Sequence, residues 1–142
     1  MREIVIIFPF NTREQKILVI EEYIHHYNRS FWKYVSGGVD KEEKDFITHA
    51  KEELAEEVGM SSEGWHHFHQ LEKIFGNREI HFFIAEDPIE MENPQENPDA
   101  DIILQSVWVN YEEFMHMLDT KQLMWDQASM AALMVFRKYQ IK

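Results

Sequence analysis

The chain has no cysteine, and no apolar stretch in it approaches the length of a membrane span. None of its 142 residues is cysteine, so a disulfide framework and thiol chemistry are both excluded. A transmembrane helix needs about 20 apolar residues. The apolar part of the N-terminal MREIVIIFPF is too short even for a signal peptide and is typical of a strand. We therefore expect a cytoplasmic protein with no membrane partner.

Basic residues are scarce relative to acidic ones. Lysine and arginine together number 14 against 26 aspartates and glutamates, which gives a net charge of −12. A polyanion would be repelled by such a chain, so nucleic acid and anionic membrane surfaces are unlikely partners by charge alone. A small phosphorylated substrate is still compatible, provided that metal ions screen an acidic cleft. The length and the hydrophobic fraction of 44% fit one globular domain over residues 1–142.

The order of apolar runs and turn signals predicts a central mixed sheet with helices on both faces. Two β-branched runs near the N-terminus, Glu3–Phe8 and Ile17–Ile20, predict a hairpin. The other predicted strands are Phe31–Val35, His67–Phe75, Glu79–Glu86 and Gln105–Val109. The predicted helices are Asp45–Val58, Tyr111–Leu118 and Gln127–Tyr139. Tyr23–Ser30 is expected to be a polar connector and Pro88–Ala100 a loop.

One face of the first predicted helix carries three carboxylates. Each helical residue advances by about 100°, so Glu53, Glu56 and Glu57 fall within one narrow arc. At a separation of ~6 Å and an effective dielectric constant of ~20, each pair repels by about 3 kcal/mol. Such a cluster is tolerable on a solvated face, or it is useful when it holds a divalent cation. Ligands that are all oxygen favour a hard metal such as Mg²⁺ or Mn²⁺.

The residues around this helix favour a site over a solvated surface. Gly37 and Gly38 precede it, and Gly59 supplies a left-handed helix stop. An apolar stripe runs beside the carboxylates and consists of Phe46, Ile47, Ala50, Leu54 and Val58. A glycine loop that leads into a helix with one buried and one acidic face is typical of a catalytic layout.

The segment from Gly37 to Met60 resembles the Nudix box. That pattern reads Gly, five residues, Glu, seven residues, Arg-Glu, an apolar residue, any residue, Glu-Glu, any residue, Gly and an apolar residue. The positions that match are Gly38, Glu53, Leu54, Glu56, Glu57, Gly59 and Met60. Lys44 stands where the family has Glu, and Glu52 stands where it has Arg. The resemblance implies the α/β/α sandwich of the Nudix fold, with Glu53, Glu56 and Glu57 binding Mg²⁺ or Mn²⁺ and catalysing hydrolysis.

Two further stretches resemble the dihydroneopterin triphosphate and dATP pyrophosphohydrolase group of that family. They are FWKYVSGGVD, from Phe31 to Asp40, and the segment from Val107 to Leu133. The resemblance implies a nucleoside triphosphate-like substrate that is split into a monophosphate and pyrophosphate.

Two alternatives stay open at this point. LVIEEYIHHY lines up with a strand of the ADP-ribose pyrophosphatase group, but Glu21 and Ile24 stand in place of its two basic residues. A catalytically weak nucleotide-binding or regulatory protein is the alternative from another class, and its support is the two departures from the box.

Further residues are candidates for the same site. Gly37 and Gly38 are expected to bind substrate in the loop before the helix, and Tyr23 and Trp32 to stack on a heterocyclic base. Core packing is the competing interpretation of Trp32. Family resemblance also implies an additional carboxylate from a distant loop, for which Asp101 is favoured over Glu96 and Asp99 because it lies closest to the next strand. The expected partner is a small phosphoanhydride bound by a monomer or homodimer.

The run Trp65–His69, with sequence WHHFH, invites a zinc interpretation. In a regular strand His67 and His69 would share one face. No third ligand follows at metal-site spacing, and zinc prefers a tetrahedral set. The sequence alone therefore favours a strand with polar imidazoles on its open face.

The two departures from the box predict a charge exchange. Lys44 and Glu52 reproduce the family's pair of opposite charges with the signs swapped. If they meet, Lys44→Glu and Glu52→Arg should each impair activity or stability, by about 0.5–1 kcal/mol for an exposed pair. The double variant, which restores the family pattern, should recover most of the loss. Purely additive effects in this double-mutant cycle would contradict the pairing.

Overall fold

The computed structural model describes residues 3–39, 45–72, 78–92 and 103–139, and a β-sheet occupies its centre. The strands are β1 (Glu3–Asn11), β2 (Lys16–Ile24), β3 (Arg29–Lys33), β4 (Val35–Val39), β5 (Met60–Ser61), β6 (Gly64–Leu71), β7 (Ile80–Glu86), β8 (Ile89–Glu90) and β9 (Ile103–Val109). The helices are α1 (Phe46–Val58), α2 (Tyr111–Asp119) and α3 (Asp126–Lys138), with a short 3₁₀ helix at His25–Tyr27. No helix in these described ranges is long and apolar enough to cross a membrane.

Strand β1 organises the sheet, because its two edges serve three partners. Along one edge it pairs with β7 in parallel, and β7 pairs in turn with β6. Along the other edge it pairs first with β4, up to Ile7↔Val35, and then with β2, from Phe10↔Ile17. Strand β2 continues past β1 and takes β3 and β9 as its own antiparallel neighbours. The sheet is therefore mixed, as predicted, and it divides at β1.

The division explains how a proline is accommodated in the central strand. Pro9 lies between the last pair with β4 and the first pair with β2. The amide of Ile4 donates to the carbonyl of Glu79 on the β7 side. Backbone groups alternate between the two edges of a strand, so the even-numbered residues of β1 face β7 and the odd-numbered ones, including Pro9, face the opposite edge. Proline has no N–H to donate. At position 9 this costs no strand hydrogen bond, because the neighbour of β1 changes there from β4 to β2.

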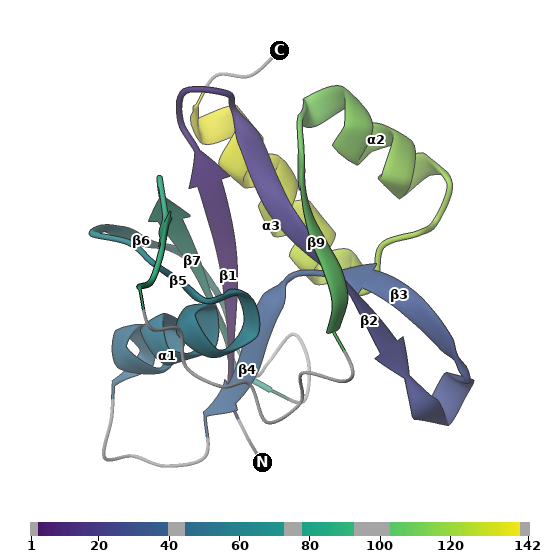
Figure 1. Cartoon of the computed structure of the whole chain (residues 1–142), viewed down its shortest axis with the longest axis horizontal. Helices are drawn as coiled ribbons and strands as arrows, with labels where there is room; N and C mark the ends of the chain where they lie inside the picture. Colours follow the sequence, from purple (N-terminus) through teal and green to yellow (C-terminus); the bar gives the residue numbers. More distant parts are fainter. Residues whose placement is uncertain (1–2, 40–44, 73–77, 93–102, 140–142) are drawn as a thin grey trace.

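Helices cover both faces of the sheet (Figure 1). Alternate residues of β1 enter two separate cores, as expected for a strand buried on both sides. One core holds Ile6, Phe8 and Phe10 and is closed by α2 and α3. The other holds Val5 and Ile7 and is closed by α1 through its apolar stripe. The predicted α/β/α sandwich is confirmed.

Local signals set the ends of α1 where the sequence predicts them. The side chain of Asp45 accepts a hydrogen bond from the amide of Thr48 at 2.9 Å, which is an N-cap. Gly59 adopts a left-handed conformation with φ of 66° and ends the helix. Between these caps, Ala50 and Leu54 are fully buried. The predicted range of this helix is therefore confirmed.

Two predicted irregular segments contain strands. The connector expected over Tyr23–Ser30 is wrong at both ends, because β2 extends to Ile24 and β3 begins at Arg29. The segment was predicted as a connector because its side chains are polar, but polar side chains also fit a two-stranded ribbon whose faces are partly solvated. Within Pro88–Ala100, expected to be a loop, Ile89–Glu90 forms β8 and pairs with β5. Residues 93–100 of this segment lie outside the described residues.

Strand β6 differs from a regular strand at its histidines. A bulge pairs His67 with Phe83 but His69 with Phe82. These two phenylalanines are consecutive and enter opposite cores. The expectation that His67 and His69 share a face is therefore wrong, because the extra residue of the bulge interrupts the alternation.

Candidate active site

The acidic face of α1 packs directly on strand β4. A Cβ atom at Gly37 would lie 2.2 Å from Cδ of Glu53 and 2.3 Å from its Oε2. The Glu53 carboxylate thus occupies the space that any larger residue at position 37 would need. A side chain at position 37 would have to displace the end of the Glu53 side chain. The glycine is not needed for a left-handed backbone, because Gly59 is the glycine with positive φ among the described residues.

Glu57 lies one turn further along α1 and is the most perturbed carboxyl of the site. Its Oε1 accepts a hydrogen bond from the amide of Ser36 at 3.1 Å. Burial raises the pKa of Glu57 to about 8, while Lys33 and the Ser36 amide act against the rise and Glu53 adds to it. In the absence of a cation this carboxyl therefore favours its neutral form near neutral pH.

A neighbouring ion pair belongs to the same cluster. Lys33 Nζ lies 3.0 Å from Glu22 Oε1, and the two side chains are only 12% and 21% exposed. Both charges influence the Glu57 carboxyl, so they lie close to it. The sequence analysis missed Glu22 and Lys33. Their signal was a charged residue on each of two paired strands, but it was not visible because the predicted strand ended at Ile20, before Glu22.

The three predicted carboxylates are placed unequally. Glu53 and Glu57 come together at β4, and Glu56, which is partly buried, shares their helix. Within residues 3–39, 45–72, 78–92 and 103–139, no three acidic or histidine side chains are close enough to hold a metal ion. The donor set is nonetheless carboxylate oxygen, and the cost of charging Glu57 would be relieved by a cation. The site thus fits a hard divalent metal chemically.

Glu52 faces a different side of α1 from Glu53. It lines a cavity of about 300 Å³ between the helix and the β5 region, together with Ala55 and Trp65. Lys44 lies outside the described residues, so the predicted Lys44–Glu52 pair stays a prediction. Asp101, with the competing Glu96 and Asp99, lies outside them as well.

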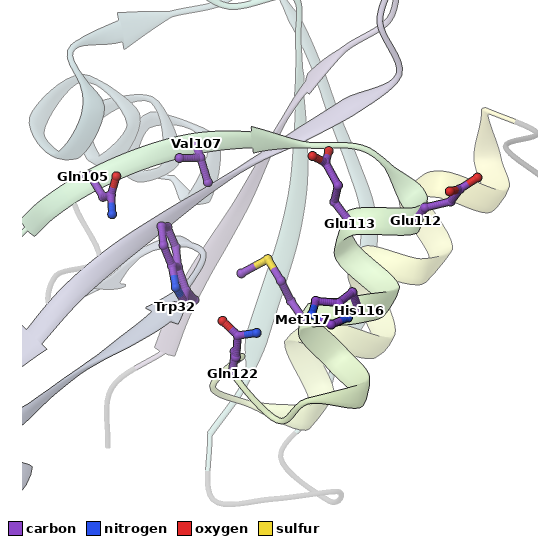
Figure 2. A pocket seen from close by; sticks show the side chains of 8 residues that line it. All are labelled: Trp32, Gln105, Val107, Glu112, Glu113, His116, Met117 and Gln122. Atoms are coloured by element: carbon purple, nitrogen blue, oxygen red, sulfur yellow. The ribbon is translucent and has the colours of Figure 1, made fainter.

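Trp32 lines an open groove on the other face of β3 from the carboxylates. Figure 2 shows its indole between β9 and α2, facing Met117. The groove has a volume of about 470 Å³ and is lined by Trp32, Gln105, Val107, Glu112, Glu113, His116, Met117 and Gln122. Trp32 also packs against the core on the side of α2 and α3. The structure therefore places Trp32 in a groove but does not bring it to Glu53 and Glu57.

The remaining candidates have structural contacts of their own. The Tyr23 hydroxyl donates to the Asn28 side chain, across the turn between β2 and β3. Gly38 lies in β4 opposite Ile4 of β1. A role of Tyr23, Gly37 and Gly38 in substrate binding stays a prediction.

Comparisons with known proteins bear on the family and the fold. A family model of the NUDIX domain matches residues 1–133. No curated protein matches the chain.

Two solved structures illustrate the shared fold. One is the crystal structure of an ADP compounds hydrolase, with a TM-score of 0.70 and 19% identity over 97% of this chain and 72% of that one. The other is MutT, from a study of the proteins of the fish pathogen Aliivibrio salmonicida and of Vibrio cholerae. Its TM-score is 0.63, with 19% identity over 81% of this chain and 84% of that one. At this identity the two structures establish a common fold.

The contact between Gly37 and Glu53 predicts a change of sign in a double-mutant cycle. In the wild-type background, Gly37→Ala should destabilise the protein by about 1–3 kcal/mol, because the new methyl group meets the Glu53 side chain. In a Glu53→Ala background, the same substitution should stabilise by about 0.4–1 kcal/mol through the unfolded state. Urea denaturation of the four proteins measures both values. Equal effects in the two backgrounds would contradict the close packing.

The buried Glu57 predicts a pH-dependent stability of the metal-free protein. Its pKa is about 8 in the folded protein against an ordinary 4.5. The folded protein therefore keeps a proton that the unfolded chain releases, and stability present below pH 4.5 is lost as the pH rises to about 8. The full loss is on the order of 5 kcal/mol. Glu57→Gln should remove this slope, so its advantage over the wild type should grow between about pH 5 and pH 8 in denaturation with a chelator.

Proposed function

The chain belongs to the Nudix family of hydrolases, and from that premise we propose that it hydrolyses a phosphoanhydride bond in a nucleoside triphosphate-like substrate with the help of Mg²⁺ or Mn²⁺. The observation that carries the proposal is the half-buried pair of carboxylates that α1 holds against β4: Glu57 Oε1 accepts a hydrogen bond from the Ser36 amide at 3.1 Å, and the Glu53 side chain lies against Gly37. Desolvation raises the pKa of Glu57 to about 8, and the pair is unfavourable unless a cation compensates it. A polyphosphate that arrives with a metal ion supplies that compensation.

The residues of the chain have distinct roles in this proposal. Glu56 and Glu57 would be the main metal ligands, and the Ser36 amide holds Glu57 in orientation. Glu53, fixed over Gly37, would be a further ligand or would orient the attacking water. A bound divalent ion would polarise the phosphoryl group and lower the pKa of a bound water. The additional carboxylate, proposed to be Asp101, would serve as base or ligand.

The reaction needs no covalent intermediate. The water oxygen forms a bond to phosphorus, the bridging P–O bond of the anhydride breaks, and a carboxylate accepts the water proton. The products are a monophosphate and pyrophosphate. No serine or cysteine nucleophile is required, which agrees with a chain that has no cysteine.

The surroundings of Glu21 favour a triphosphate over ADP-ribose. This residue takes the place of a basic residue in the ADP-ribose pyrophosphatase pattern. Its carboxylate accepts hydrogen bonds from Ser30 at 2.7 Å and from Gln105 at 3.0 Å, and these bonds lower its pKa. Glu21 therefore stays charged and cannot supply the positive charge that the ADP-ribose pattern has at this position, which removes the specific reason to prefer ADP-ribose. Hydrolysis of ADP-ribose or of another nucleoside diphosphate derivative is the second candidate, because one solved structure of the same fold is an ADP compounds hydrolase.

The groove beside Trp32 is the proposed place of the uncharged part of the substrate. Trp32 and Met117 offer flat and adaptable apolar contacts, whereas Glu112 and Glu113 would repel phosphate. Trp32 and Lys33 are consecutive in β3, so the groove and the carboxylates lie on opposite faces of this strand. A substrate that uses both would have to pass around the strand. A cytoplasmic location belongs to the same proposal.

A substrate panel tests the proposed function. With Mg²⁺ or Mn²⁺ the protein should turn over at least one nucleoside or pterin triphosphate and release pyrophosphate, and Glu56→Gln should lower the rate about 100-fold or more. Glu90→Gln is the matched control, because Glu90 is an exposed carboxylate on β8. Preferential cleavage of ADP-ribose would select the second candidate.

Isothermal titration, run beside the turnover panel, distinguishes an enzyme from a regulatory protein. Tight nucleotide binding in isothermal titration, without product from any member of the panel, would indicate a nucleotide sensor that has lost catalysis. No turnover and no effect of Glu56→Gln would contradict the proposal as a whole.

A further inference from the structure

Two histidines from neighbouring strands meet beside the first turn of α1, away from Glu53 and Glu57. His67 of β6 and His81 of β7 approach with His67 Nε2 and His81 Nδ1 3.1 Å apart. The other ring nitrogen of His81 lies 2.6 Å from Glu79 Oε1. The order of the contacts is therefore carboxylate, imidazole, imidazole. The proposed hydrolysis makes no use of any of these three residues.

Packing fixes the orientation of both rings. His81 is only 3% exposed, and its ring stacks on Phe46 with centroids 3.6 Å apart. The His67 ring stacks on Phe83 at 4.6 Å, while its other side is open to solvent. The pair consequently combines one buried, immobile ligand with one that water can reach.

The Glu79 contact determines which nitrogen of His81 is available. A carboxylate at 2.6 Å is a hydrogen-bond acceptor, so the proton of a neutral His81 lies on Nε2. Its Nδ1 then presents a lone pair to His67, and His67 fills that position by donating its Nε2–H. If the proton of His67 moves from Nε2 to Nδ1 through solvent, the lone pairs of His67 Nε2 and His81 Nδ1 face the same point between the two rings, where a metal ion could bind.

The separation of the two nitrogens suits a shared metal ion. Two nitrogens bound to one zinc ion at about 2.1 Å with a tetrahedral angle lie roughly 3.4 Å apart. The observed 3.1 Å requires little further movement. A carboxylate behind a metal-binding histidine is also the usual way in which proteins orient such a ligand.

We propose that His67 and His81 form a binding site for a transition-metal ion of the zinc type, with Glu79 orienting His81. Among the described residues no third histidine or acidic side chain completes the set, so water fills the other positions. Two imidazoles favour Zn²⁺, Ni²⁺ or Cu²⁺ over Mg²⁺.

The site is independent of the carboxylates on α1 and would act on structure. A metal ion would join β6 to β7 under Phe46, the first residue of α1. An ion that binds the folded protein but not the unfolded chain raises the melting temperature of the protein. Zinc should therefore stabilise the protein even where it has no effect on hydrolysis.

Titration calorimetry with ZnCl₂, in excess Mg²⁺ to occupy carboxylate sites, tests the proposal. The wild type should bind one zinc ion per chain, and His67→Ala should weaken this binding by at least about tenfold. Glu79→Gln should weaken it by about 10- to 100-fold, as expected for loss of a residue that orients a ligand. His69→Ala is the matched control, because His69 is in the same strand but on the other side of the bulge.

The outcomes are decisive in both directions. Zinc should raise the melting temperature of the wild type and of His69→Ala but not of His67→Ala, and it should shift the ¹⁵N resonances of His67 Nε2 and His81 Nδ1. Equal zinc affinity of the wild type and His67→Ala, or an equal loss in His69→Ala, would overturn the proposal. In that case the contact is a hydrogen bond that shares one proton.

Discussion

The packing of half-buried carboxylates where α1 meets β4 is the constraint on which the rest of the site depends. Glu53 fills the space above Gly37, and Glu57 reaches the Ser36 amide. Both contacts need α1 to lie against β4. The apolar side of α1 maintains this approach through Leu54 and Ala50, which are fully buried under the helix. Hydrophobic packing thus stabilises an arrangement that its charges oppose.

The division of the sheet at β1 determines which charges surround Glu57. Because β4 takes the first half of one edge of β1 and β2 the second half, the chain crosses from β3 to β4 beside α1. This crossing brings Lys33, the last residue of β3, together with Ser36 of β4. The ion pair of Lys33 with Glu22 follows from the pairing of β2 with β3. A partner switch in the centre of the sheet therefore sets the electrostatics of the site.

The sequence contained the helix, its terminal glycine and its acidic face, because these depend on local spacing. Glu53, Glu57 and Gly59 could all be placed from the 3.6-residue period and from the preference for glycine at the end of a helix. Glu22 and Lys33 could not, since their contribution depends on which strands pair beyond β1. The bulge between His67 and His69 could not be predicted for a related reason. The sequence of one strand does not show where it has one residue more than the strand it pairs with. The meeting of His67 with His81 likewise depends on the register between two strands.

The charge of the cluster finally accounts for why an acidic protein can act on an anionic substrate. Glu22, Glu53 and Glu57 oppose the single ammonium of Lys33, so the four groups sum to −2 when all are ionised. One divalent cation balances that charge. A polyphosphate needs more than balance, because its own negative charge must also be neutralised before it can approach. Under the proposed function, the site would therefore select a substrate that arrives with its metal, and the same carboxylates would repel free polyphosphate.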